Sequence, residues 1–506
     1  MAKSLRTTAG TGACAALCVA ALLTACEVGP NFHAPAAPGD ASYGKAQQAV
    51  PATIGSDNDT QRLVTGMAIP EQWWTLFESP KLNQLVEEAL RGNADVAAAK
   101  AALRQAHELY LAQRTNLFPT VDGGFNGTRA KYPIASVTAP VVAVDPTYNL
   151  YTAQLSVSYL PDIFGGVRRA DEAAKAAEDA NRFQLEATFL TLSSNVVVTA
   201  IQEASLRGQI DATNRLVQLQ QRLLDAAQRQ RSAGTASDLD VLTQQSALAQ
   251  TLATLPPLRK QLGQTRDQLT ALLGRLPLGE PGEQFTLGDL KLPHDLPLSL
   301  PGALVAQRPD VRLAQENLHQ ASAQVGVALA NMLPQFSIDG QLGSSALSIG
   351  DLFTPYTGFW SLGGSLTQTL FDAGNLLHHK RAADAALDQA AAQYRAAVIL
   401  ACQSVADSLQ ALQEDAAALS ASTTAAAAAQ RPLELSTRQH ELGGLSTVAV
   451  IAAEQSYQQA VLALVQAQAN RYADTAGLFQ ALGGGWWNRN KALADISTTA
   501  GSGQAQ

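Results

Sequence analysis

The sequence contains the same structural unit twice, and this repeat organises the whole fold. Residues 93–124 align without a gap to residues 308–339. In both segments apolar residues recur at alternating steps of three and four, which predicts a helix packed along a coiled-coil seam. Each of these helices is expected to end at a proline. The matched pairs include Asp95 and Asp310, Leu103 and Leu318, Asn116 and Asn331, and Pro119 and Pro334.

Beyond each proline the period of the pattern changes to two. Alternation over about ten residues is typical of membrane-spanning strands, which turn apolar side chains to lipid and polar ones to a water-filled lumen. A soluble, half-buried hairpin has the same pattern, so the pattern alone leaves both open, and an export signal at the N-terminus favours the membrane. The four predicted strands lie at about 120–131, 148–161, 335–346 and 357–371.

A very long helical hairpin is predicted after each pair of strands. The outgoing helices are expected at about 167–231 and 375–441. A helix of about 65 residues is roughly 97 Å long, which no globular core requires. The return helices run towards Gly274 and Gly483, and Pro256-Pro257 should kink the first of them because proline cannot donate to the helix.

The tips of the two hairpins also match. They are predicted near 232–237 and 441–446. Gly234 and Gly443 supply the positive φ that ends a helix, and Ser237 and Ser446 can each cap the helix that follows.

The first 25 residues are typical of a secretory signal peptide, in which Lys3 and Arg6 precede an apolar run too short to span a bilayer. Leu23-Thr24-Ala25-Cys26 resembles a bacterial lipobox, where the cysteine thiol receives a diacylglycerol before cleavage. Cys26 is therefore the predicted lipid attachment site, with diacylglycerol and an N-acyl chain. An ordinary signal peptide with a chance cysteine is the alternative. Glu27 after the cysteine is compatible with delivery to the outer membrane.

Composition argues against several other classes of function. The formal net charge is −8 and no run is rich in lysine and arginine, which argues against nucleic-acid binding. No run of 18 consecutive apolar residues follows the signal, so no membrane-spanning helix is predicted there. His378 and His379 are adjacent and point about 100° apart on a helix, which does not suit one metal ion. We expect no catalytic residue, no metal site, no cofactor besides the lipid, and no enzyme activity.

Four motifs occur in order along nearly the whole mature chain. They are Cys26-Glu27-Val28-Gly29-Pro30-Asn31-Phe32 with Pro35; Trp73-Trp74 with Phe77, Pro80, Leu82, Asn93 and Asp95; Arg308-Pro309-Asp310-Val311; and Ala481-Leu482-Gly483-Gly484-Gly485-Trp486. With these motifs on a duplicated framework, the chain resembles the TolC-like outer-membrane factors. The resemblance is to the branch of efflux outer-membrane lipoproteins called NodT or OprM-like.

The resemblance implies a mainly α-helical fold with membrane β-structure. Three chains of four strands would share one twelve-stranded β-barrel, and their paired helical hairpins would form a periplasmic α-barrel. The expected organisation is a lipoprotein signal peptide at 1–25, an acylated arm at 26–70, a first repeat at 71–290, a second repeat at 291–487 and a flexible tail at 488–506.

The resemblance also implies a function and partners. The chain would be the outer-membrane channel subunit of a tripartite efflux pump that exports drugs or other toxic small molecules. Its partners would be two further copies of itself, a periplasmic adaptor (membrane fusion) protein, an inner-membrane transporter of the proton-driven RND type, and outer-membrane lipid. A duct for type I secretion of proteins or peptides is an alternative. An envelope-spanning coiled-coil scaffold that does not conduct is another, although it would have no alternating strands.

Members of this family close the duct at the helical tips. The resemblance places apolar gate positions at Leu239 and Val448, while the second copy has Ala449 and Ala452 where relatives carry carboxylates and Gln455 where some carry arginine. We hypothesise that a contact between Asp240 and His440 holds the closed state in a pH-dependent way, with Asp238 adding negative charge. Two solvated tip residues would be the alternative. The adaptor would dock on the tips, at Gly234, Thr235, Ser237, Gly443, Gly444 and Ser446.

Overall fold

A computed structural model of the chain describes residues 27–36, 53–54, 60–131, 147–277, 285–299 and 301–488. The predicted signal peptide, the lipid attachment site Cys26 and the tail beyond residue 488 lie outside the described residues. The chain divides into two compact units. The strand unit contains residues 1–34, 104–180 and 314–393, and the hairpin unit contains residues 35–103, 181–313 and 394–506. The units do not follow the two repeats, because each repeat contributes strands to one unit and a helical hairpin to the other.

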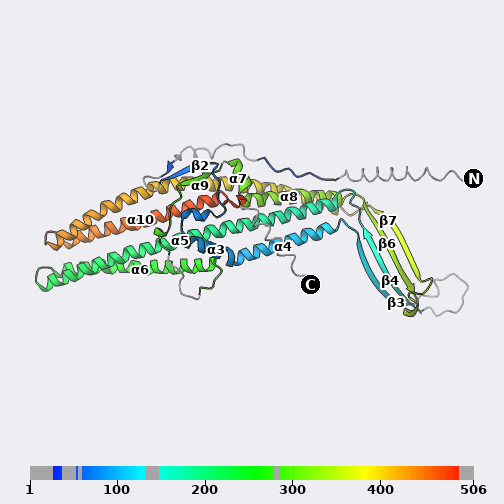
Figure 1. Ribbon diagram of the computed structural model, residues 1–506, viewed down its shortest axis with the longest axis horizontal. Coiled ribbons are helices and arrows are strands. Elements are labelled where there is room, and N and C mark those ends of the chain that lie inside the picture. The colour runs from blue at the N-terminus through cyan, green and yellow to red at the C-terminus, as the bar shows by residue number, and fades with distance from the viewer. Residues whose placement is uncertain are drawn as a thin grey trace, which may run out of the picture. The chain divides into compact units, whose positions relative to one another are not determined.

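The strand unit contains one antiparallel sheet of four strands in the order β3-β4-β6-β7 (Figure 1). Each repeat supplies one hairpin, and the pairing of β4 with β6 joins the two. Residues 368–371, which were predicted to extend the last strand, have no regular structure. They lead into a turn at which the Asp372 carboxylate accepts from the N–H groups of Gly374 and Leu376. The strands are β3 Thr120–Lys131, β4 Thr147–Tyr159, β6 Gln335–Ala346 and β7 Gly358–Thr367.

The register of this sheet separates apolar from polar side chains. Leu155 pairs with Leu342, which pairs with Trp360, so these three side chains share one face. They are 53%, 63% and 77% exposed. One residue along each strand, Ser156, Gln341 and Ser361 form a polar row on the opposite face. Within a single chain, the sheet therefore exposes a large apolar face as well as a polar one.

Four shorter helices precede the strands of the two repeats. α3 (Pro80–Gly92) leads into α4 (Ala94–Thr115), and α7 (Pro301–Gln307) leads into α8 (Pro309–Ala330). The break before α4 is stabilised by Asn93, whose side-chain oxygen accepts from the N–H groups of Asp95 and Val96. The corresponding break before α8 has Arg308, which donates to Asp310 and to the carbonyl of Ala481.

The helical hairpins have equal lengths in the two repeats. α5 (Gly166–Ser232) and α9 (Asn375–Glu441) contain 67 residues each, and α6 (Asp238–Leu272) and α10 (Thr447–Ala481) contain 35 each. At 1.5 Å per residue, a helix as long as α5 extends over roughly 100 Å. α6 continues through Pro256-Pro257, so the proline pair does not end the helix, and α9 continues through Pro432 in the same way.

An aromatic core and a small sheet complete the hairpin unit. Trp73 stacks on Phe479 with ring centroids 5.5 Å apart, and both side chains are buried. β2 (Gln61–Thr65) pairs with β1 (Thr53–Ile54) and, in parallel, with β5 (Asp295–Leu298). From the sequence we expected only an acylated arm over 26–70, and we did not predict the strand β2 within that range. The side chain of Gln61 is fully buried and donates to the carbonyl of Pro293, a partner 232 residues away that a local pattern cannot reveal.

Among the described helices, the segment Val448–Ala481 of α10 is long and apolar enough by length and composition to cross a membrane, with mean hydropathy 1.2. The sequence criterion did not single out this segment, because it counted consecutive apolar residues and the segment intersperses polar ones. Two ionisable side chains of α10, Glu454 and Arg471, are 0% and 1% exposed. Arg471 donates to the carbonyl of Leu412 in α9, so α10 is packed as a member of the helical bundle.

Candidate gate at the helical tips

The two helical tips end in the same backbone motif. In each, a glycine with positive φ follows the outgoing helix, Gly234 at φ 75° and Gly443 at φ 79°. The N–H of the residue after this glycine donates to a carbonyl five residues earlier, which satisfies a carbonyl that the helix end leaves free. The bonds are Thr235 to Gln230 and Gly444 to Gln439, both at 2.9 Å.

The first tip adds a set of side-chain bonds at the start of α6. The hydroxyl oxygen of Ser237 accepts from the N–H of Asp240 at 3.2 Å, and the Asp240 carboxylate accepts from the N–H of Ser237 at 3.0 Å. This reciprocal capping box satisfies two backbone donors at once. Asp238 forms an ion pair with Arg231, between two exposed side chains. Both predicted acidic residues of this tip are therefore held by partners within the same hairpin.

The second tip lacks these bonds. Ser446 precedes α10 but its side chain makes no capping hydrogen bond. Ala449 occupies the position that matches Asp240, and it has no carboxylate to accept a hydrogen bond from the N–H of Ser446. Instead the Nδ1 atom of His440, which is 8% exposed, lies 2.9 Å from the carbonyl oxygen of Leu445. This tip is therefore held mainly by its backbone and one buried imidazole.

Asp240 and His440, which were predicted to be in contact, are close enough to interact electrostatically. Hydrogen bonds from Ser237 hold the pKa of Asp240 below its usual value, and the charge of His440 contributes weakly in the same direction. Each side chain nevertheless directs its hydrogen bonds to its own hairpin. The hypothesis that this contact holds a closed gate stays a prediction.

The predicted apolar gate positions are exposed in the single chain. Leu239 is 72% exposed and Val448 is 62% exposed, whereas Val241 and Val450, which lie two positions further along the same helices, are buried. The first turn of each return helix therefore turns one apolar side chain out of its own hairpin. The six residues predicted to dock an adaptor are all exposed: Gly234, Thr235, Ser237, Gly443, Gly444 and Ser446.

Sequence reasoning missed three buried polar side chains in the helices close behind the tips. Glu454 in α10 is 0% exposed, and Gln220 in α5 and Gln244 in α6 are each 1% exposed. The carboxylate oxygens of Glu454 and the amide of Gln244 have no hydrogen-bond partner in the described part of the chain. Burial raises the pKa of Glu454 to about 7, and the neighbouring Gln220 side chain opposes part of this rise. The sequence could have revealed the burial of Glu454, because this residue lies four residues after Val450 and so occupies an apolar position in the 3/4 pattern of α10.

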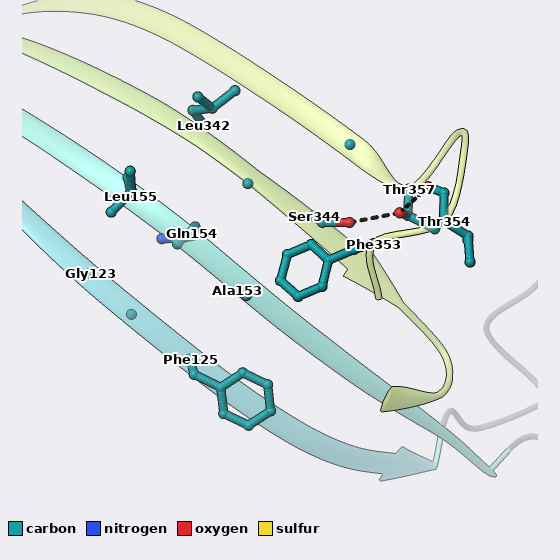
Figure 2. Close-up of a pocket in the computed structure, with 13 residues that line it drawn as sticks. Gly123, Phe125, Ala153, Gln154, Leu155, Leu342, Ser344, Phe353, Thr354 and Thr357 are labelled. Carbon is teal, nitrogen blue, oxygen red and sulfur yellow. Dashed lines mark hydrogen bonds between the residues drawn. The ribbon is translucent and has the colours of Figure 1, made fainter. Parts of the chain in front are cut away.

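A pocket lies on the sheet, where the segment after β6 returns towards β7 (Figure 2). The hydroxyl of Ser344 donates to Thr357 at 2.7 Å, which fixes this return. The cavity volume is 680 Å³, and Phe125, Leu155 and Phe353 line it. Within the described residues, no group of three or more histidine, cysteine, aspartate or glutamate side chains could hold a metal ion.

Known proteins share this sequence and architecture. The sequence model of the family described as "Outer membrane efflux protein" matches residues 85–275 and 300–484. The pyoverdine export outer membrane protein OpmQ of Pseudomonas putida is 29% identical over 424 residues, covering 83% of this chain and 89% of that protein. The solvent efflux pump outer membrane protein SrpC of Pseudomonas putida is 26% identical over 481 residues, covering 92% and 96%.

Solved structures agree with these relatives. The outer-membrane channel OprN superposes with a TM-score of 0.80 at 27% identity, covering 91% of this chain and 100% of that chain. The CmeC outer membrane channel of Campylobacter jejuni superposes with a TM-score of 0.83 at 21% identity, covering 94% and 98%. These likenesses confirm the mainly helical, TolC-like fold with a β-portion that the sequence predicted.

Proposed function

The chain belongs to the outer membrane efflux protein family, and we propose that it is the channel subunit of a tripartite pump that exports small molecules. Family membership places it in the outer membrane as an efflux channel. One observation supports the finer proposal most directly. A sheet with an exposed apolar face and an exposed polar face continues through β4 and β7 into helices of 67 residues. The strands suit lipid outside and water inside, and the helices suit a long aqueous duct.

The proposed working unit is a homotrimer. β3 and β7 are the outer strands of the sheet, and among the described residues each pairs with one other strand. An unpaired strand edge in lipid leaves backbone polar groups without hydrogen bonds, which costs several kcal/mol for each group. Pairing β3 of one copy with β7 of the next would remove all edges in a ring. Three copies of four strands would form a twelve-stranded barrel.

The proposed partners meet the helical tips. A periplasmic adaptor would dock on the exposed turns at Gly234 and Gly443, and it would connect the duct to a proton-driven inner-membrane transporter of the RND type. In that arrangement the transporter couples energy to export, and this subunit conducts without catalysing a reaction. The names of the relatives, pyoverdine export and solvent efflux, are consistent with small-molecule cargo.

The proposed gate consists of the apolar side chains that each tip exposes. In a closed ring of hairpins, Leu239 and Val448 would point to the axis and narrow the duct. The Asp240–His440 contact would then link neighbouring hairpins. Single-channel recordings of Asp240→Ala and His440→Ala should each show larger or more frequent openings than the parent. Unchanged conductance in both variants would contradict the link.

We also propose that Cys26 carries the lipid anchor. The mature chain would begin at this cysteine, with a diacylglycerol on sulfur and an N-acyl chain on the new N-terminus. Growth with labelled palmitate should label the parent protein and leave Cys26→Ser unlabelled. Label on Cys26→Ser would place the lipid elsewhere.

The channel proposal is tested by electrical recording. Purified protein added to a planar bilayer should produce discrete conductance steps, and cross-linking in detergent should trap a species of three chains. A deletion strain should accumulate exported toxic compounds and recover when the gene is restored. Folded protein that inserts without any conductance would contradict the channel and favour a scaffold.

A further inference from the structure

Three glycines form a slot that holds residues 27–33 against the helices of the strand unit. Gly29 has φ 99°, and a Cβ there would lie 2.5 Å from the Cα of Gly326 in α8. A Cβ on Gly326 would lie 2.8 Å from Cγ of Arg169, and one on Gly165 would lie 2.7 Å from Cγ of Glu27. The segment therefore contacts these helices so closely that no side chain fits at any of the three positions.

Polar contacts hold the segment along its length. The N–H of Val28 donates to the carbonyl of Phe164 at 3.1 Å, and Nε of Arg169 donates to the carbonyl of Val28 at 3.2 Å. Arg169 is 3% exposed in α5 and also donates to the Asn31 side chain at 2.6 Å. Its guanidinium pairs with Glu27 at 3.3 Å. Arg169 also donates to Glu172 of its own helix at 2.7 Å, so one buried guanidinium joins Glu27, Val28 and Asn31 to α5 through charge-assisted contacts.

An imidazole holds the far end of the segment. The ring of Phe32 stacks on His319 with centroids 4.3 Å apart and an interplanar angle of 14°. His319 lies between two carboxylates, Glu172 at 2.9 Å and Glu316 at 3.3 Å. Hydrogen bonds to Glu316 and Glu172 raise the pKa of His319 against the opposing effect of burial. A protonated imidazole attracts the face of Phe32, so the ion pairs strengthen the stack.

The slot lies at the end of the sheet where the strands meet the helices. Phe164, which accepts from Val28, has its ring 6.5 Å from that of Phe336 at the start of β6. Large apolar side chains are exposed around this end: Phe118 is 66% exposed, Leu370 93% and Phe371 88%. Exposed aromatic and apolar belts mark the boundary between lipid and water on membrane β-structures.

We propose that this slot fixes the acylated N-terminus at the base of the strands, so that the lipid anchor and the sheet enter the same leaflet at a set depth. The inference rests on the proposed acylation of Cys26. In the sequence, Cys26 directly precedes Glu27, the first residue that the slot holds. The acyl chains on Cys26 would then enter the bilayer beside the exposed side chains of Phe118, Leu370 and Phe371. A lipid on a free tether would retain the protein at the membrane without setting the depth of the strands.

The test loosens the slot once from the helix side and once from the segment side. Gly326→Ala places a methyl group against the Arg169 side chain, and Gly263→Ala is its matched control, because a Cβ at this helical glycine of α6 meets nothing within 4 Å. Phe32→Ala is a second variant that removes the stack from the other side and spares the helix. Amide exchange over residues 27–34 should rise at least tenfold in both slot variants and stay unchanged in Gly263→Ala.

A second readout follows strand insertion. In outer-membrane vesicles, palmitate label on Cys26 should persist in all variants, while the fraction of chains whose β3–β4 and β6–β7 hairpins resist added protease should fall at least threefold in Gly326→Ala and Phe32→Ala. Unchanged amide exchange in both would show that the slot does not hold the segment. Faster exchange with full insertion would show that the slot does not set depth. Conductance of the parent in planar bilayers tests the channel separately, so failure of the slot and failure of the proposed function are distinguishable.

Discussion

At the scale of single residues, Glu454 has the least favourable surroundings of the described side chains near the tips. It is 0% exposed, and its carboxylate oxygens lack hydrogen-bond partners in the described part of the chain. An unpaired buried charge costs several kcal/mol, and a carboxyl group there avoids the cost by keeping its proton. Since the neighbouring Gln220 is neutral, the surroundings of Glu454 carry no charge at low pH, and they contain an unpaired buried charge when Glu454 ionises.

We expect Glu454→Gln to remove a pH dependence of stability. The folded pKa of about 7 lies above the ordinary value of 4.5, so the native state holds a proton that the unfolded chain releases. The free energy of unfolding of the parent should therefore fall by roughly 3 kcal/mol as pH rises from 4.5 to 7, and then level off. Thermal melts across this range should show a flatter profile for Glu454→Gln. Glu441→Gln, at an exposed position, is the control, and parallel profiles for all three proteins would contradict the prediction.

At the scale of elements, the two return helices differ in how they begin. α6 starts with a capping box, and α10 starts with a serine that makes no capping bond. The helices have the same length and the preceding turns have the same backbone motif, so the pair forms an internal comparison. The asymmetry makes the first tip the more firmly ordered one, and it commits Asp240 to its own helix.

Ser237→Ala should therefore weaken the first tip and Ser446→Ala should not weaken the second. Loss of an N-cap hydrogen bond costs about 1 kcal/mol, which corresponds to roughly fivefold faster amide exchange in the first turn of α6. The matching serine in the second copy is the control, because its side chain forms no such bond. Equal effects in the two variants, measured by exchange and mass spectrometry, would mean that the capping box does not stabilise α6.

The two faces of the sheet make a second prediction at this scale. Leu155 lies on the apolar face and Gln154, its neighbour in β4, lies on the polar face. An arginine facing lipid near the bilayer centre costs roughly 2–4 kcal/mol, and one facing the lumen costs little. Leu155→Arg should lower the amount of folded protein in the outer membrane several-fold, whereas Gln154→Arg should fold normally and shift ion selectivity towards anions. A larger loss of folded protein for Gln154→Arg than for Leu155→Arg would mean that the Gln154 face, not the Leu155 face, contacts lipid.

At the scale of the whole molecule, the two repeats share a scaffold and differ in charge at the tip. The first copy has Asp238 and Asp240, and the second has Thr447 and Ala449 at the matching positions. In a trimer each difference would occur three times around the duct. Carboxylates near an aqueous constriction attract cations, so the number of such rings sets the selectivity of the channel.

We expect the parent channel to be only weakly selective for cations, and Ala449→Asp to increase that selectivity. The added carboxylate would restore an acidic ring that relatives carry in the second copy. Reversal potentials measured in asymmetric salt should shift towards the cation equilibrium potential in the variant. Ala452→Ser, which adds a polar group without charge, is the control. A reversal potential unchanged by Ala449→Asp would place this residue away from the conducting path.

Much of the fold could be predicted because its signals are local. The strands, the long helices and the glycine-ended tips follow from periods of two and 3/4 and from residues that favour helix ends. The small sheet of β1, β2 and β5 could not be predicted in this way, because Gln61 finds its partners more than 200 residues away. At the tips, the sequence indicated the residues but not their partners: Asp240 bonds to Ser237, and His440 bonds to Leu445.

The amino-acid sequence alone determined the duplicated unit and the order of its elements, because repeats and periodicity are properties of the chain, and four motifs in it indicated the family by resemblance. The sequence could not show which buried polar groups lack partners. It also could not show that Arg169 and His319 both contact the N-terminal segment, because those contacts join residues 138 or more positions apart. Close packing between distant segments settles them. The tertiary structure therefore decided the slot behind the predicted lipid anchor and the buried Glu454, the two features that periodicity did not reveal.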